Sequence, residues 1–287
     1  MRKVAVITDS NSGITQKQAK ELGIRVMPMP FMIDGETYFE DITLTQEEFY
    51  KKLMGNVQIS TSQPSLGDVI KLWEELLGDY DEIVHIPMSS GLSTACQSAL
   101  SICGEYGGRV QAADNQRISV TQRQSVLDAM ELARAGLSAL QIKEYLEKVK
   151  FDSSIYIMIN DLKYLKKGGR ITPAAAAFGA VLNIKPVLQI QGERLDAFGK
   201  ARGIKHARRM MIEAMRADFG NRFAGDRMQL MAAYTYNKEA ALSFKSEIEE
   251  AFPGFEVYMD PLSLSVSCHI GPGALAIACS KKIDIFK

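Results

Sequence analysis

The chain has 287 residues, of which 46% are hydrophobic and 24% charged, so it is long enough to bury one large core or two of ordinary size. Lys and Arg number 34, as do Asp and Glu, and this zero net charge gives no electrostatic reason to expect a nucleic-acid partner. The four cysteines lack metal-binding spacing, and no stretch approaches the roughly 18 apolar residues of a membrane span. We therefore expect a soluble, cytoplasmic protein without a metal or other cofactor.

The first half of the chain alternates short apolar runs with amphipathic segments. Strands are predicted near residues 4–7, 24–29, 83–86 and 110–113, and helices around Ala19 and near residues 49–54, 66–77, 93–106, 120–134 and 139–150. Thr45 and Glu48 have the spacing of a capping box, and Ser65 is placed to cap the helix that follows it. This order is typical of an open parallel sheet, and it predicts an N-terminal α/β domain over residues 1–150.

The pattern changes after residue 150 and predicts a second, mixed α+β domain over residues 151–287. Strands are expected near residues 154–159, 228–234, 255–260 and 274–279, and helices near residues 162–165, 206–218 and 238–252. Thr172 followed by Pro173 is a typical helix start, and Gln191-Gly192 is the expected turn of a hairpin.

Two segments are unusually rich in hydroxyl side chains. Residues 58–65 carry four Ser or Thr residues, and residues 88–94 carry four more directly after the apolar run 83–87. We read each segment as a turn that opens a helix, a setting in which backbone N–H groups and hydroxyls can surround an anion. In an open α/β sheet these turns and residues 8–12 would share the edge at the carboxyl ends of the strands. The pattern favours holding a carboxylate or phosphate.

The histidines and two basic turns are further candidates. His85 lies in an apolar strand and is expected in the core, and His206 is expected in a solvated position. His269 precedes a Gly- and Pro-rich stretch, where we expect a bend that lets it donate to an anion or titrate near neutral pH. Arg170 follows two glycines, so its guanidinium can approach a carboxylate or phosphate, and Arg202 ends a second turn of this kind.

The residues alone leave alternatives open. A Ser/His hydrolase or transferase would use Ser93 with His269, but the G-x-S-x-G elbow is absent, and Asp9 and Asp68 are isolated carboxylates with capping roles. A lipid-responsive regulator is a third reading. The Met-rich stretch 26–33 and the small residues 174–181 are compatible with ordinary core packing. Together with an anion-holding end, they also suit a long apolar ligand tunnel between the two domains.

Five motifs in order along the chain carry a family resemblance. They occupy residues 4–12, 59–65, 89–94, 162–171 and 269–274. In these segments the chain resembles the DegV family, the bacterial fatty-acid-binding proteins that include the FakB subunits of fatty acid kinase. The resemblance implies two α/β domains with a long-chain fatty acid buried between them. It also implies that Thr61 and Ser93 hydrogen-bond the carboxylate, with Ser62 in the same loop and His269 reaching from the second domain.

The resemblance further implies a partner protein. The binding protein would not be the catalyst; it would present the carboxylate to a separate ATP-dependent kinase subunit and carry the acyl phosphate to phospholipid synthesis, which leaves room for transient membrane contact. We assign Arg170 and Arg202 to the side that faces the phosphate and the kinase. Two positions depart from the family pattern, Asn115 and Cys268, and either would change pocket polarity or width if it lined the tunnel.

Overall fold

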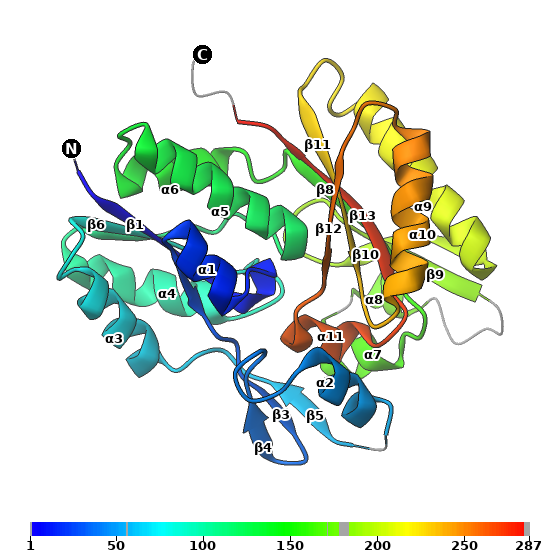
Figure 1. Ribbon diagram of the computed structural model, residues 1–287, viewed down its shortest axis with the longest axis horizontal. Helices are drawn as coiled ribbons and strands as arrows, with labels where there is room; N and C mark the ends of the chain where they lie inside the picture. Colours follow the sequence, from blue (N-terminus) through cyan, green and yellow to red (C-terminus); the bar gives the residue numbers. More distant parts are fainter. Residues whose placement is uncertain (1, 56, 171, 178–183, 284–287) are drawn as a thin grey trace.

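The protein is described here by a computed structural model over residues 2–55, 57–170, 172–177 and 184–283 (Figure 1). Within these residues the strands form a four-stranded parallel sheet, a six-stranded mixed sheet and a three-stranded antiparallel sheet. The predicted fold class, a parallel-sheet half followed by a mixed half, is confirmed. No helix in the described ranges is both long and apolar enough to cross a membrane.

The parallel sheet is built from the first 112 residues and is covered by helices on both faces. Its elements and their covering helices are β1 (Val4–Asp9), η1 (Ser10–Ser12), α1 (Gln16–Leu22), β2 (Arg25–Met27), α3 (Leu66–Leu76), β6 (Glu82–Ile86), α4 (Ala95–Cys103), η2 (Gly104–Tyr106), β7 (Val110–Ala112), α5 (Ser119–Arg134) and α6 (Ala139–Lys148). The strand order is β2-β1-β6-β7. Buried residues of α1, α5 and α6 pack on one face, and those of α3 and α4 pack on the other.

Several predicted helix starts in this half are confirmed by their hydrogen bonds. The Ser65 hydroxyl accepts from the N–H of Asp68 at the start of α3. Thr45 and Glu48 form the predicted capping box at the start of α2 (Gln46–Leu53). These short polar side chains satisfy N–H groups that the helix itself leaves unpaired, which is why each helix begins where it does.

A three-stranded sheet beside α2 was not predicted. It has the order β4-β3-β5, with β3 (Phe31–Ile33), β4 (Glu36–Tyr38) and β5 (Ile59–Thr61). The interpretation of residues 58–65 as a turn throughout was therefore wrong, because residues 59–61 pair with β3 and only the residues after Thr61 form the turn. Strands of three residues are too short for an alternating pattern to be recognised.

The six-stranded sheet comes from the second half of the chain. Its elements are β8 (Ser153–Met158), α7 (Lys163–Gly168), α8 (Pro173–Ala176), β9 (Ile184–Ile190), β10 (Asp196–Arg202), α9 (Gly203–Gly220), β11 (Met228–Tyr234), α10 (Lys238–Ala251), β12 (Val257–Pro261), α11 (Leu264–Ile270) and β13 (Leu275–Lys281). The order is β10-β9-β8-β13-β11-β12, and only the β11–β12 pair is parallel. The predicted hairpin is confirmed as β9–β10, and the Thr172 hydroxyl caps α8 as predicted.

The two faces of this sheet have different neighbours. Helices α9 and α10 cover the outer face, and α5 of the first half lies toward the other (Figure 1). At one end of the sheet, α11 packs beside α7 and α2 (Figure 1). The inner face therefore meets the first half of the chain.

Helix α11 corrects the sequence analysis, which expected a bend around His269. The Ser263 hydroxyl caps the helix by accepting from the N–H of Val266, and the chain leaves the helix at Gly271. Its hydroxyl- and β-branched-rich sequence has low intrinsic helix propensity. The helix forms because Leu264 and Cys268, one turn apart, enter the core of the three-stranded sheet.

Contacts between the halves are extensive. The Tyr50 hydroxyl donates to Ser267 Oγ at 2.9 Å, and the N–H of Leu264 donates to Glu40 Oε2 at 2.8 Å. Helix α11, from the second half of the chain, completes the core of the three-stranded sheet in the first half. The predicted domain boundary near residue 150 stays a prediction.

Candidate ligand-binding site

A cavity of about 280 Å³ lies between the inner face of the six-stranded sheet and the loops at the carboxyl ends of β1 and β6. This volume is close to the lower end of the range for small-molecule sites. Most of its wall is apolar. The apolar lining consists of Met29, Met88, Leu92, Ile118, Val120, Ile155, Ile157, Leu165, Ile190, Leu195, Ala233, Leu262, Val266, Ile270, Ala276 and Ala278.

Small side chains on the inner face of the sheet leave room for this cavity. In β13, Ala276 and Ala278 line the cavity, whereas the alternate residues Leu275 and Ile277 pack in the core beneath α9 and α10. Ala233 of β11 stands directly across from Ala276 in the sheet. Because successive strand residues point to opposite faces, this alternation of small and large side chains makes one face hollow and the other filled.

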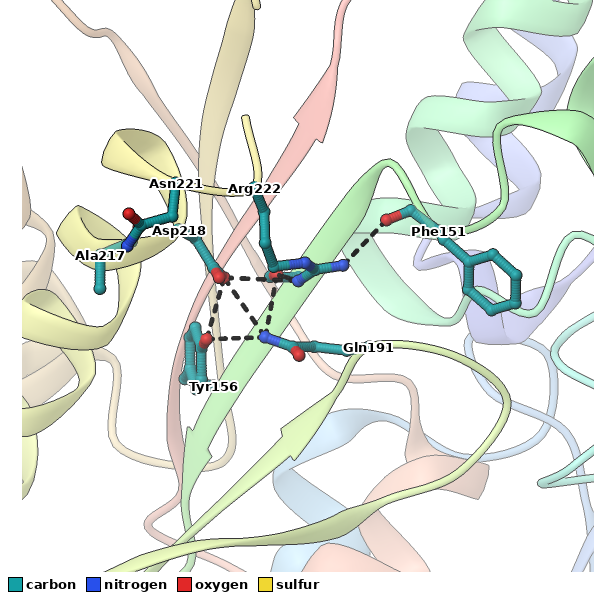
Figure 2. A network of polar contacts seen from close by, with 8 residues as sticks. Phe151, Tyr156, Gln191, Ala217, Asp218, Asn221 and Arg222 are labelled. Carbon is teal, nitrogen blue, oxygen red and sulfur yellow. Dashed lines mark hydrogen bonds and ion pairs between the residues drawn. The ribbon is translucent and has the colours of Figure 1, made fainter. Parts of the chain in front are cut away.

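The β9–β10 hairpin closes one side of the cavity. Ile190, before the turn, and Leu195, after it, both line the cavity. Figure 2 shows how the turn is held: Gln191 Nε2 donates to the Tyr156 hydroxyl at 2.7 Å, and that hydroxyl donates to Asp218 Oδ2 at 2.9 Å.

The same turn is attached to the hydroxyl-rich segment 88–94. Ser89 Oγ donates to the carbonyl oxygen of Glu193 at 2.7 Å. A Cβ atom on Gly91 would lie 2.5 Å from that same oxygen, so only glycine permits this approach. Part of the second hydroxyl-rich segment therefore joins the two halves of the protein.

Five of the six predicted site residues surround one end of the cavity. Thr61, Ser62, Ser93, Arg170 and His269 all line it, and we call them the polar mouth. Ser62 and Arg170 are exposed, and the other three are half-buried. The structure thus brings together side chains from both halves of the chain.

His269 stands at the centre of the polar mouth. Its Nε2 shares a hydrogen bond of 2.9 Å with Thr61 Oγ1. Burial, assisted by the positive charge of Arg170, lowers the pKa of His269 to about 4. The imidazole is therefore neutral near pH 7, and the expectation that it titrates near neutral pH was wrong.

Glycines around α7 and α11 explain the Gly-Gly-Arg and His-Ile-Gly motifs. A Cβ atom on Gly168 would lie 2.0 Å from His269 Nδ1, and one on Gly271 would lie 2.2 Å from the Tyr164 ring. The two helices thus pack so closely that each presents a glycine to an aromatic ring of the other. Arg170 Nη1 donates to the carbonyl oxygen of Gly168, which keeps the guanidinium beside the mouth.

Gln63 links the two hydroxyl-rich segments and was not singled out from the sequence. Its Oε1 accepts from Thr94 Oγ1 at 2.7 Å and from Ser98 Oγ at 3.0 Å. Ser93 Oγ accepts from the N–H of Ala95 at 3.2 Å, so its hydroxyl hydrogen remains available to a ligand. Gln63 lies within the motif at residues 59–65, but its bonding role could not be predicted from the sequence because it depends on α4 lying beside the turn.

Other predicted residues lie elsewhere. Arg202 is exposed at the end of β10 remote from Leu195, where its N–H donates to His206 Nδ1, and it is not brought to the cavity. His85 is buried against Trp73, as expected for a core histidine. Neither departure from the family pattern is among the described lining residues. Asn115 accepts from the N–H of Arg117, and Cys268 packs in the core of the three-stranded sheet.

Three buried polar residues in the cavity wall were also missed. Asn11, Ser119 and Ser265 line the cavity away from solvent. Asn11 was expected only as part of the turn at residues 8–12, and neither Ser119 nor Ser265 was singled out from the sequence. No local signal could identify them, because their common feature is the cavity that they share.

These features define an α/β protein of three sheets with a largely apolar cavity and a polar mouth. Comparison with known proteins gives the family. Residues 3–282 match the sequence signature of the DegV family, described as uncharacterised proteins. The chain is 31% identical over 277 residues to a DegV domain-containing protein of Deinococcus radiodurans, covering 96% of this chain and 97% of that one. It therefore belongs to the DegV family.

Solved structures of the family have the same fold. A fatty-acid-binding DegV family protein of Thermus thermophilus superimposes with a TM-score of 0.89 at 31% identity, covering 98% of this chain and 100% of that one. DegV of Bacillus subtilis, described as a fatty-acid-binding protein, gives a TM-score of 0.86 at 29% identity, with coverage of 98% and 100%. The likeness extends over nearly the whole length of each protein.

Proposed function

We propose that this protein binds a long-chain fatty acid, with the acyl chain in the cavity and the carboxylate at the polar mouth. The observation that carries the proposal is the composition of the cavity wall, which is apolar along most of its surface and carries the partly exposed polar residues of the mouth. Each buried methylene contributes about 0.8 kcal/mol, so an acyl chain can be held tightly without other polar contacts. Relatives from Thermus thermophilus and Bacillus subtilis are described as fatty-acid-binding proteins, which supports the same ligand class here.

The polar mouth suits a carboxylate. A carboxylate leaving water needs several hydrogen bonds, and the hydroxyls of Thr61 and Ser93 can donate them. His269 is neutral near pH 7 and keeps one N–H donor, and Arg170 adds a positive charge at the exposed edge. Ser62 lies in the same loop as Thr61. We therefore assign Thr61, Ser62, Ser93 and His269 to carboxylate recognition, and Arg170 to the exposed side, where a phosphate on the carboxylate would lie.

We further propose that a separate kinase subunit phosphorylates the bound fatty acid and that this protein presents the substrate without catalysing the reaction. A second hollow of about 430 Å³ lies on the outer side of the Thr61–His269 pair, and Arg170 borders both spaces. Lys163 and Lys167 line the outer hollow, so it is positively charged where a phosphate on the carboxylate would emerge. Arg202 is a more distant candidate for contact with the kinase.

The hydrolase alternative receives no support from the described contacts. His269 Nε2 bonds to Thr61 and not to Ser93, and Nδ1 faces Gly168 without a carboxylate to orient the ring. A serine nucleophile needs an adjacent base that is itself oriented. Reaction of wild-type protein with a serine-directed probe, lost in Ser93→Ala, would restore this alternative.

Lipid analysis tests the proposal directly. Protein purified under native conditions should release a fatty acid on denaturation, detected by mass spectrometry in a stoichiometric amount. Absence of bound lipid together with absence of binding on titration with fatty acids would exclude the function.

A partner test separates the two parts of the proposal. Arg170→Ala should retain fatty-acid binding and reduce acyl phosphate formation by an added fatty acid kinase subunit. Normal turnover with Arg170→Ala would contradict the role of this side chain while leaving lipid binding intact.

A further inference from the structure

The cavity has a second polar region, distinct from the mouth. Asn11 is 1% exposed, and Ser119 and Ser265 are each 6% exposed, whereas the residues of the mouth are half-buried or exposed. All three line the cavity among apolar neighbours. We call them the deep polar group.

The deep polar group lies beyond the position of the carboxylate. Ser265 precedes His269 by four residues on α11, which places the two about 6 Å apart along the helix axis. Ser263 and Ser265 both donate to Asn11 Oδ1, so Asn11 lies at the level of the first turn of α11 and not at the level of the mouth. A fatty acid held at the mouth would pass this level with its methylene chain.

One donor in the deep polar group lacks a partner. Asn11 is paired, because its side chain hydrogen-bonds to the Asp9 carboxyl and its Nδ2 contacts the sulfur of Met88. The Ser119 hydroxyl has no hydrogen-bond partner within the described parts of the chain, although the residue is more than nine-tenths buried. Polar groups buried without partners are unfavourable, so such a group facing a cavity indicates a ligand atom that completes it.

The backbone at Ser119 adds to this picture. Ser119 is the first residue of the 16-residue helix α5, and no side chain caps that helix. Its φ of 56° is in the left-handed region that non-glycine residues rarely adopt, a strain often found at ligand sites. The uncapped first turn, between Ile118 and Val120 of the cavity wall, favours an electronegative atom such as oxygen.

We propose that Asn11, Ser119 and Ser265 form a subsite for an oxygen atom on the acyl chain, so that the protein accepts hydroxylated long-chain fatty acids. The inference rests on the proposed fatty-acid-binding function and specifies the class of fatty acid. A chain hydroxyl can donate to or accept from the Ser119 hydroxyl. An unsubstituted chain leaves the Ser119 donor unpaired at this level.

Competitive displacement of a fluorescent fatty acid tests the subsite. The ligands are stearic acid and hydroxystearic acids whose hydroxyl lies near the carboxyl end, in mid-chain or near the methyl end. With wild-type protein, at least one hydroxylated isomer should bind as tightly as stearic acid or more tightly. Ser119→Ala should weaken that isomer about tenfold and change stearic acid affinity less than twofold, because only the hydroxylated ligand uses the lost donor.

Two further variants keep the outcome interpretable. Ser101→Ala, at an exposed position of α4, is the matched control and should alter neither ligand. Ser119→Gly tolerates the positive φ and replaces Ser119→Ala if the latter does not fold. The subsite is refuted if every hydroxylated isomer binds at least tenfold more weakly than stearic acid to wild-type protein, or if Ser119→Ala weakens both ligand classes equally. Loss of stearic acid binding by wild-type protein would instead refute the proposed function.

Discussion

Replacing Gly168 with alanine tests how His269 is positioned. A Cβ atom at this position would lie 2.0 Å from His269 Nδ1, whereas ordinary contacts begin at 3.4 Å, so the ring must move by about 1.4 Å. A movement of that size is enough to break the 2.9 Å hydrogen bond between His269 and Thr61. The structure therefore predicts damage at the polar mouth from a substitution that carries no functional group.

The magnitude follows from two terms. Overpacking between α7 and α11 should lower the free energy of unfolding by about 1–3 kcal/mol, partly offset by the better helix propensity of alanine. Loss of one hydrogen-bond donor at the carboxylate should weaken binding by about 1 kcal/mol, and displacement of the His269 ring should weaken it further. Together these effects predict roughly tenfold weaker fatty-acid binding.

Displacement titration and chemical denaturation measure the two effects. Gly104→Ala is the control, because Gly104 ends α4 with φ of −61° and a Cβ atom there would meet nothing within 4 Å. It should change affinity little and leave stability equal or slightly higher. If Gly168→Ala bound fatty acid as tightly as wild type, the account of His269 as a donor positioned by close helix packing would be refuted.

Three further outcomes are expected. Thr61→Ala and Ser93→Ala should each weaken fatty-acid binding by about 1–3 kcal/mol in displacement titrations, and unchanged affinity in both would remove these hydroxyls from the site. Ala276→Leu should fill the cavity and abolish binding while the far-UV spectrum stays native; retained binding would place the chain elsewhere. Burial raises the pKa of Glu40 from 4.5 to about 7, so the folded carboxyl holds a proton that the unfolded chain releases, and stability falls as the pH rises through this range. Glu40→Gln should therefore stabilise the protein by about 1–3 kcal/mol above pH 7 and have little effect below pH 4.5, measured by denaturation; equal changes at both pH values would contradict this.

Local chemistry was enough to predict many element boundaries. The caps at Thr45, Ser65 and Thr172 depend on hydrogen bonds within four residues, so the pattern of short polar side chains identifies them directly. The hairpin at Gln191-Gly192 was identified for the same reason. The short strands of the three-stranded sheet and helix α11 were missed because they are stabilised by packing against distant segments.

The site residues were predicted individually, but their arrangement was not. Thr61 and His269 are 208 residues apart in the chain and share a hydrogen bond only because α11 packs against β5. Arg202 has a sequence context similar to that of Arg170, yet β10 carries it away from the cavity. Residue type and local spacing cannot distinguish these two basic turns, because the turns differ only in where the folded chain places them.

By itself the sequence determined the class of fold, the family motifs and the presence of hydroxyl-rich turns suited to an anion. Only the tertiary structure decided that the first segment is partly a strand, that His269 is a neutral helical residue, and that the cavity contains buried donors below its mouth. The physical reason is that caps and turns are made by neighbours in the chain. A cavity, its burial and the pKa of a group beside it are produced by residues that meet only when the two halves pack together.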